Sequence, residues 1–151
     1  MNFTCKIISY NSADYLQWIA LRAQILRLPL GMNLTDEDIK NDKNEIIICI
    51  FDRKNPVGGL QLKPLGINKV RLRQMAVSEN YRNQGLGKKL LNFAEKTALK
   101  NGFFNIELHA RKTAVEFYKK SGYQVSGQVF IEVGIPHLFM KKELCRQANY
   151  F

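Results

Sequence analysis

Short apolar runs alternate with amphipathic stretches along most of this chain, and the alternation predicts a mixed α/β fold. Unbroken apolar runs are typical of buried strands, whereas apolar residues three and four positions apart indicate a helix. The apolar runs predict strands at 3–8, 45–52, 57–63, 70–77, 103–110, 123–132 and 137–143. Helical spacing predicts helices at 12–27, 84–100 and 114–121. This order implies a mixed sheet with helices on both faces.

Residues with capping chemistry define where these helices begin and end. Ser12 is expected to cap the first helix, and Thr35 with Asp38 to cap a short helix or turn. Thr113 and Glu116 have the spacing of a capping box, and Gly122 is a natural residue to end the helix that follows. The expected apolar face of the first helix comprises Leu16, Ile19, Ala20, Ala23 and Leu26.

A glycine-containing segment, Arg82-Asn83-Gln84-Gly85-Leu86-Gly87, lies between a predicted strand and a predicted helix. N–H groups in the first turn of a helix lack partners and carry the positive end of its dipole, so they bind phosphate well. Arg82 and Lys88 add positive charge beside that turn. The segment is not a P-loop, because the upstream glycine and the Ser or Thr after Lys88 are missing. It is not a dinucleotide-binding fingerprint either, because the third glycine of that motif is missing. An ordinary strand–helix turn remains the alternative.

Together with two later blocks, this segment resembles the GNAT superfamily of acyl-CoA-dependent N-acyltransferases. R-x-x-G-x-G after an apolar strand is similar to the family's cofactor loop. The string A-x-x-F-Y-x-x-x-G-Y, from Ala114 to Tyr123, is similar to its second signature. Residues 129–140, with Glu132 and an I-P-H string ending at His137, are similar to the closing hairpin of the ElaA-like branch. The resemblance covers about residues 70–143.

The resemblance implies a single GNAT-like domain over residues 1–151, of α/β (α+β) class. Its sheet would be mixed, mostly antiparallel and twisted, with a splayed cofactor cleft between the strands at 70–77 and 103–110. Acetyl-CoA is the implied co-substrate, with its pantetheine bound to backbone groups as if it were a strand. Arg111 stands where the family usually has Asn. The implied cofactor-binding residues are Met75, Ala76, Val77, Arg82, Asn83, Gln84, Gly85, Leu86, Gly87, Lys88, Arg111 and Tyr118.

The implied reaction is direct attack by a primary amine on the thioester, which makes the protein an N-acetyltransferase. Tyr118 is the expected acid for the departing thiolate, since a phenol can donate as the C–S bond breaks. Glu132 and His137 are candidates to accept the amine proton, and a structural hydrogen bond between them is the competing interpretation. We expect His109 to form a structural hydrogen bond and Glu107 to face solvent. No metal is expected.

Two other functional classes stay open. A non-catalytic acyl-CoA-binding module would keep the cofactor loop and lose turnover. The net charge of +10 and a pI near 9.7 would also suit a nucleic-acid-binding protein. However, Lys and Arg are spread along the whole chain without a nucleic-acid-binding motif, so we rank coenzyme A above nucleic acid as the partner of this charge.

The remaining features concern where in the cell the protein is expected to be found. The longest apolar run, at residues 46–51, is far too short to span a bilayer, and the first residues contain no signal-peptide pattern. We therefore expect a cytoplasmic protein without a membrane partner. Cys5, Cys49 and Cys145 lack metal-ligand spacing and are expected to be reduced, structural thiols. The oligomeric state stays open, with a homodimer as one option, and the sequence does not identify the amine acceptor.

Overall fold

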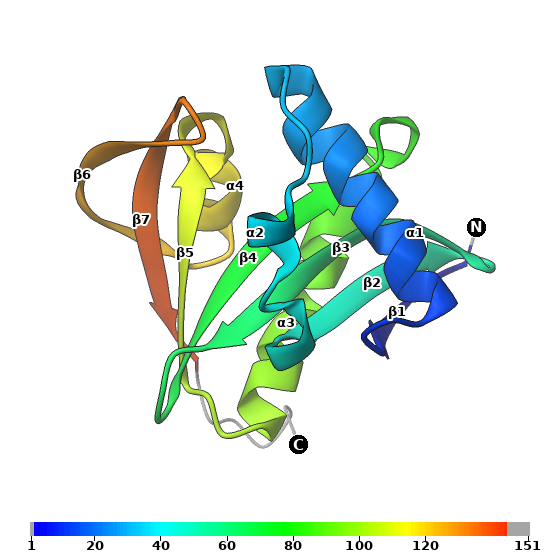
Figure 1. The fold of residues 1–151 in the computed structure, drawn as a ribbon. Helices are drawn as coiled ribbons and strands as arrows, with labels where there is room; N and C mark the ends of the chain where they lie inside the picture. Colours follow the sequence, from blue (N-terminus) through cyan, green and yellow to red (C-terminus); the bar gives the residue numbers. More distant parts are fainter. Residues whose placement is uncertain (1, 145–151) are drawn as a thin grey trace. The chain divides into compact units, whose positions relative to one another are not determined.

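The computed structural model describes residues 2–144, and Figure 1 shows their helices and strands. The strands are β1 (Phe3–Ile8), β2 (Ile46–Asp52), β3 (Asn55–Pro64), β4 (Lys69–Val77), β5 (Asn105–Arg111), β6 (Gln124–Glu132) and β7 (Ile135–Glu143). They follow the order β1-β2-β3-β4-β5-β7-β6. β4 and β5 are parallel, whereas the pairs β1–β2, β2–β3, β5–β7 and β6–β7 are antiparallel. The predicted mixed, mostly antiparallel sheet is therefore confirmed.

The α-helices of these residues lie close to the predicted ranges. They are α1 (Ala13–Arg22), α2 (Asp36–Ile39), α3 (Leu86–Lys100) and α4 (Val115–Lys120). The first helix continues as a π-helical segment at Ala23–Arg27, and Leu28–Leu30 form a 3₁₀ turn. The predicted helix at 12–27 thus exists, but its last five residues depart from α-helical hydrogen bonding.

The described residues group into two compact units, which share β4 and α3. The first unit contains residues up to 63 and 74–94, and the second contains 64–73 and those from 95 onward. In the first unit, α1 and α3 lie on opposite faces of the strands (Figure 1). A buried cluster joins one of these faces to α1 and consists of Ile8, Tyr15, Trp18, Ile47, Cys49, Phe51 and Ala76.

The buried face of α1 differs from the predicted one. Tyr15, Trp18 and Arg22 are buried, whereas Leu16 is 61% exposed. A buried arginine was not expected, and polar partners explain it. Arg22 Nη1 donates to Asp42 Oδ2 at 2.7 Å and to Gln61 Oε1 at 2.8 Å, so its charge is compensated inside the unit. Of the predicted apolar face, Ile19 and Leu26 pack against the buried cluster, whereas Leu16 and Ala20 are exposed, so the prediction is correct in part.

Close backbone packing in the first unit requires a glycine at position 58. A Cβ atom there would lie 2.9 Å from Ala76 O and 3.3 Å from Val77 Cα. Any larger side chain would therefore push β3 away from the end of β4. Because Met75–Val77 are expected cofactor contacts, Gly58 fixes the strand that carries them.

In the second unit, the ends of α4 test two cap predictions. Gly122 ends the helix as predicted, with φ of 94° and a Tyr123 N–H to Tyr118 O hydrogen bond of 3.1 Å. The capping box at Thr113 is wrong. Lys112–Ala114 form a 3₁₀ turn, and Ala114 precedes the α-helix without a side-chain cap. The tighter turn moves Thr113 out of the position from which its hydroxyl could cap.

The parallel ladder between β4 and β5 is short. It joins Lys69–Leu72 to Asn105–Leu108 and ends there. Two residues later, Gln74 has a φ of 59° inside the strand, a left-handed conformation that interrupts regular pairing. The ladder thus ends within the stretch where the sequence predicts these strands to part.

Candidate active site

The N-terminus of α3 follows the glycine-containing turn that the sequence predicts, in the first unit. Arg82, Asn83, Gln84 and Gly85 are exposed, and the helix begins at Leu86. Gly85 has a φ of 78°, and a Cβ placed there would meet no other atom within 4 Å. Lys89 N–H donates to Gly85 O at 3.1 Å, which makes Gly85 the first carbonyl of the helix. The N–H groups of Leu86, Gly87 and Lys88 precede this bond, and N–H groups of a first helical turn have no acceptor within their own helix, which suits a phosphate ligand.

The basic residues of this turn are not equivalent. Arg82 Nε donates to Val77 O at 3.1 Å, so its guanidinium is tied to the end of β4. Lys89 Nζ donates to Phe3 O at 2.7 Å, which commits it to holding β1. Lys88 is exposed. Arg82 places its positive charge beside the turn while it is bonded to β4, and exposed Lys88 adds a second positive charge there.

The end of β4 presents backbone groups at one edge. Ser78 N–H bonds to Val57 O of β3 at 2.8 Å, and hydrogen-bonding direction alternates along a strand. The N–H and C=O groups of Met75 and Val77 consequently point away from β3. This is the orientation needed for a ligand that binds as an additional strand.

Gln74 adds a buried polar atom to the same strand. Its Oε1 is inaccessible to solvent and has no hydrogen-bond partner within residues 2–144. Left-handed backbone and an unsatisfied buried amide both cost free energy, and such features concentrate at functional sites. Gln74 cannot act as a base, but it can accept a hydrogen bond.

Tyr118 is enclosed by aromatic rings in the second unit. It is 7% exposed, and its ring contacts Phe117 at 5.1 Å and Tyr123 at 5.8 Å between centroids. Burial raises the pKa of the Tyr118 phenol above its ordinary value. The hydroxyl therefore keeps its proton at neutral pH, as a hydrogen-bond donor or acid must.

Glu132 and His137 are brought together, and His109 joins them. His137 Nε2 lies 3.6 Å from Glu132 Oε2, and His109 Nδ1 lies 2.9 Å from Glu132 Oε1. The connecting turn is Val133–Gly134 alone, since Glu132 pairs with Ile135. The expected hydrogen bond of His109 is present, but the sequence did not show that its partner would be Glu132. The register of β5, β6 and β7 creates this cluster.

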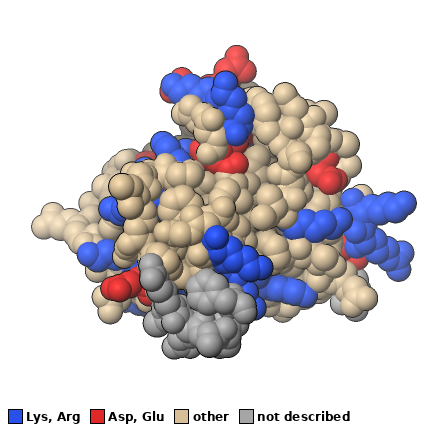
Figure 2. All heavy atoms as spheres, turned by 90° about the horizontal axis from the view of Figure 1, so that it is seen from below, with Lys and Arg blue, Asp and Glu red and all other residues tan. Residues whose placement is uncertain are grey.

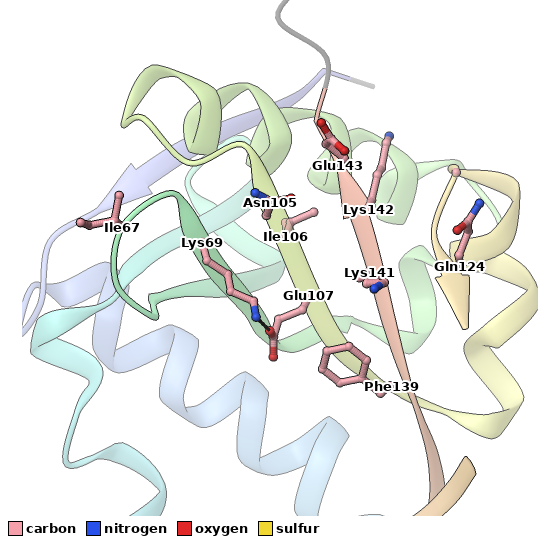
Figure 3. Close-up of a pocket in the computed structure, with 11 residues that line it drawn as sticks. Ile67, Lys69, Asn105, Ile106, Glu107, Gln124, Phe139, Lys141, Lys142 and Glu143 are labelled. Carbon is pink, nitrogen blue, oxygen red and sulfur yellow. Dashed lines mark ion pairs between the residues drawn. The ribbon is translucent and has the colours of Figure 1, made fainter. Parts of the chain in front are cut away.

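Glu107 corrects another expectation. It is buried rather than solvent-facing and binds Arg71 at 2.8 Å and Lys69 at 3.0 Å. Figure 3 shows the Lys69–Glu107 pair in a cavity of about 740 Å³ within the second unit. Phe139 also lines this cavity, and its ring contacts His109 at 6.0 Å between centroids. The cavity therefore adjoins the histidine cluster through Phe139.

The cysteines and the potential metal ligands are two further groups of side chains in residues 2–144. Cys5 and Cys49 are free thiols, and burial raises the pKa of Cys49 to about 12, so it stays protonated. Cys145 lies outside the described residues. Within the described part of the chain, no three His, Cys, Asp or Glu side chains are arranged to hold a metal ion. None of its helices combines the length and apolarity needed to cross a membrane.

Basic side chains protrude at several places on the face shown in Figure 2, with acidic ones between them.

Comparison with known proteins identifies the family to which this fold and site belong. The family described as an acetyltransferase (GNAT) domain matches residues 32–144. The structure of a proposed N-acetyltransferase from Lactobacillus plantarum is 30% identical and covers 93% of this chain and 99% of that one, with a TM-score of 0.83. Two less similar structures share the fold. Escherichia coli ElaA is 20% identical, with a TM-score of 0.79 over 94% of this chain and 99% of ElaA. A GNAT acetyltransferase from Elizabethkingia anophelis with acetyl-CoA bound is 17% identical, with a TM-score of 0.75 over 95% and 99%.

Proposed function

The chain belongs to the GNAT family of acyl-CoA-dependent acetyltransferases, and on that premise we propose that it moves an acetyl group from acetyl-CoA to a primary amine. The acceptor amine attacks the thioester carbonyl directly, without an acyl-enzyme intermediate. The observation that carries this proposal is the open first turn of α3, with Gly85 at its start and Arg82 and Lys88 beside it.

The first unit supplies the residues for the donor. N–H groups of Leu86, Gly87 and Lys88 would bind the pyrophosphate, and the side chains of Asn83 and Gln84 lie exposed beside them. Backbone groups of Met75 and Val77, with Ala76 between them, would bind the pantetheine, and Val77 N–H would stabilise the oxyanion. The direction in which these backbone groups point supports this assignment.

The second unit supplies the residues for proton transfer. Tyr118 would give a proton to the departing thiolate, and its burial supports the role because the phenol stays protonated. Glu132 and His137 would serve the acceptor side, with their 3.6 Å separation in support. Arg111, directly opposite His137 in the ladder, would contact the cofactor where other family members use Asn.

Thermal unfolding with acetyl-CoA tests the donor site. Ligand at a hundredfold excess over Kd should add about 2.7 kcal/mol to the free energy of unfolding. Gly85→Asp should remove most of that stabilisation, because it places a carboxylate where phosphate binds. Gly102→Asp is the matched control, since Gly102 also has positive φ and open surroundings, at the other end of α3. A wild-type protein that acetyl-CoA does not stabilise would contradict the proposed donor.

Turnover separates the enzyme from a non-catalytic acyl-CoA-binding module. Release of the coenzyme A thiol should be followed with acetyl-CoA and spermidine, tyramine, kanamycin or a peptide with a free N-terminal amine. Acetylation of at least one probe is the expected result. Stabilisation by acetyl-CoA without turnover of any probe would favour the module.

A further inference from the structure

Both histidines of the chain contact the single carboxylate of Glu132. They reach it from β5 and β7, while Glu132 ends β6, and all three residues belong to the second unit. The two histidines differ in burial and in the partners of their ring nitrogens. From these differences we infer separate roles for the two histidines.

His137 is fixed by the backbone. Its Nδ1 lies 2.9 Å from Ile135 O, and a carbonyl only accepts, so Nδ1 carries a proton. The ring stacks on Phe130, with 5.9 Å between centroids and 27° between planes. Only 4% of the side chain is exposed. An acceptor amine cannot reach this buried imidazole, which makes His137 a positioning residue.

His109 presents its other nitrogen to the surroundings. The 2.9 Å contact with the Glu132 carboxylate places the proton of the neutral ring on Nδ1 and leaves a lone pair on Nε2. The side chain is 26% exposed. Phe130 contacts the ring edge to face at 5.1 Å, and Phe139 contacts it from the side of the 740 Å³ cavity. The ring is thus oriented by Glu132 and partly exposed to solvent.

Building on the proposed acetyltransferase function, we propose that His109 Nε2 is the base that takes the proton from the acceptor ammonium. Glu132 holds the ring in the Nδ1–H form and stabilises the imidazolium that results. His137 packs against Glu132 from the opposite side, with its Nε2 3.6 Å from Glu132 Oε2. A carboxylate and a partly exposed imidazole that it orients together form a proton acceptor that Glu132 and His137 cannot form alone.

The proton transfer balances with acetyl transfer. Nε2 accepts one proton from R–NH₃⁺, which leaves a neutral amine and an imidazolium. The amine lone pair forms the new C–N bond with the thioester carbonyl carbon, and the C–S bond breaks with its electron pair on sulfur. Tyr118 gives its proton to the departing thiolate, the second amine proton passes to solvent, and solvent restores the proton of Tyr118. Solvent finally takes the proton from His109.

Two other charged residues, Glu107 and Arg111, lie near His109 on β5. Glu107 and Arg111 share its face of β5, because residues two apart point to the same side of a strand. Glu107 is held by Arg71 and Lys69, and Arg111 lies opposite His137 in the β5–β7 ladder. Glu132 is therefore the carboxylate that faces the His109 ring.

Nuclear magnetic resonance tests the tautomer without any acceptor. The full chain labelled with ¹⁵N-histidine has two imidazoles to assign, and His109→Gln identifies each. The expected result is an Nδ1–H tautomer for neutral His109, which shifts toward a mixture of tautomers in Glu132→Gln. A neutral His109 that carries its proton on Nε2 would overturn the proposal, whatever the outcome of activity assays.

Kinetics tests the role with whichever amine probe the wild type acetylates. His109→Gln should lower kcat/KM for the amine by about 10²–10³-fold and change the acid limb of its pH profile, while acetyl-CoA affinity stays unchanged. Added imidazole should restore part of the activity of His109→Ala, which no structural role would allow. His137→Gln should lower activity less, together with the melting temperature. A His109→Gln enzyme with wild-type kcat/KM and pH profile would overturn the inference and leave the acetyltransferase function standing.

Discussion

At the scale of single residues, Tyr118 and Tyr123 offer a direct comparison. They lie 5.8 Å apart between ring centroids, and burial raises the pKa of both phenols. Tyr123 has a structural partner, because its hydroxyl donates to Glu95 Oε2 at 2.9 Å. Removing one hydroxyl at a time therefore compares the loss of the proposed acid with the loss of this hydrogen bond.

Tyr118→Phe keeps the ring and removes the proposed acid. We expect kcat to fall by about 10²–10⁴-fold with little change in the KM for acetyl-CoA. Tyr123→Phe should instead lower the free energy of unfolding by about 1–3 kcal/mol, because buried Glu95 loses a hydrogen bond. Steady-state kinetics and urea unfolding of both variants provide the measurement. An unaltered kcat in Tyr118→Phe, under conditions where chemistry limits turnover, would leave that residue a packing role.

Glu107 should make stability depend on pH. Burial alone would raise its pKa, but hydrogen bonds and charges from Arg71 and Lys69 outweigh burial and lower the pKa overall. A carboxyl with a lowered folded pKa stabilises the protein above its unfolded pKa of about 4.3 and loses that contribution as pH falls further. Urea unfolding between pH 3 and 7 should show this loss, and Glu107→Gln should flatten the curve and cost about 2 kcal/mol at pH 7. Exposed Glu116→Gln serves as the control, and equal pH curves for the two variants would contradict the assignment.

Residue types and spacing were enough to predict the glycine-containing turn at the start of α3, because helix start, glycine and charge are all local properties. They could not predict the partners of Glu107 or His109. Alternation along a strand gives the face of a residue, but the register between strands decides which side chain stands opposite. Arg22 was missed for the same reason, since Asp42 and Gln61 are distant in sequence.

At the scale of elements, the β6–β7 hairpin carries the strain of its own turn. Val133 and Gly134 have φ values of 45° and 77°, and a β-branched residue rarely adopts positive φ. A two-residue turn with positive φ at both positions prefers Asn-Gly. The hairpin that holds Glu132 and His137 in register is therefore closed by an unfavourable residue.

Val133→Asn should relieve this strain. We expect the free energy of unfolding to rise by about 1 kcal/mol, measured by urea denaturation. Val129→Asn, at an exposed apolar position elsewhere on β6, is the control for the change in side-chain polarity. An unchanged or lower free energy of unfolding would mean that Val133 does not strain the turn.

Element prediction worked where a local cap defines the boundary. Thr35 and Asp38 form the predicted capping box, and Ser12 caps α1 through Tyr15 N–H at 3.1 Å. It failed at Thr113, where a 3₁₀ turn intervenes, and on the apolar face of α1, where a buried polar network competes with aliphatic packing. Tertiary contacts decided both cases.

At the scale of the whole molecule, a net charge of +10 influences every anionic partner. A basic surface raises association rates for coenzyme A and also promotes nonspecific binding to nucleic acid. The two effects differ in structural specificity. The proposed coenzyme A site has a defined geometry, the turn at the start of α3.

Duplex DNA should consequently bind weakly and lose affinity steeply with salt. Gel-shift titration at 50 and 200 mM salt measures this, with acetyl-CoA affinity determined in parallel. Gly85→Asp should weaken acetyl-CoA binding strongly and DNA binding little. Sequence-selective DNA binding in the nanomolar range would contradict the assignment of the charge to coenzyme A.

The distribution of rare residue types gives each unit a natural spectroscopic reporter. The only tryptophan, Trp18, is fully buried in the first unit, with its indole N–H bonded to Gln61 Oε1 at 2.8 Å. The only two histidines belong to the Glu132 cluster of the second. Intrinsic fluorescence therefore follows unfolding of one unit, and imidazole resonances follow the other. Denaturation midpoints from the two signals would coincide for a cooperative protein and diverge if the units melt separately, and neither measurement requires an added label.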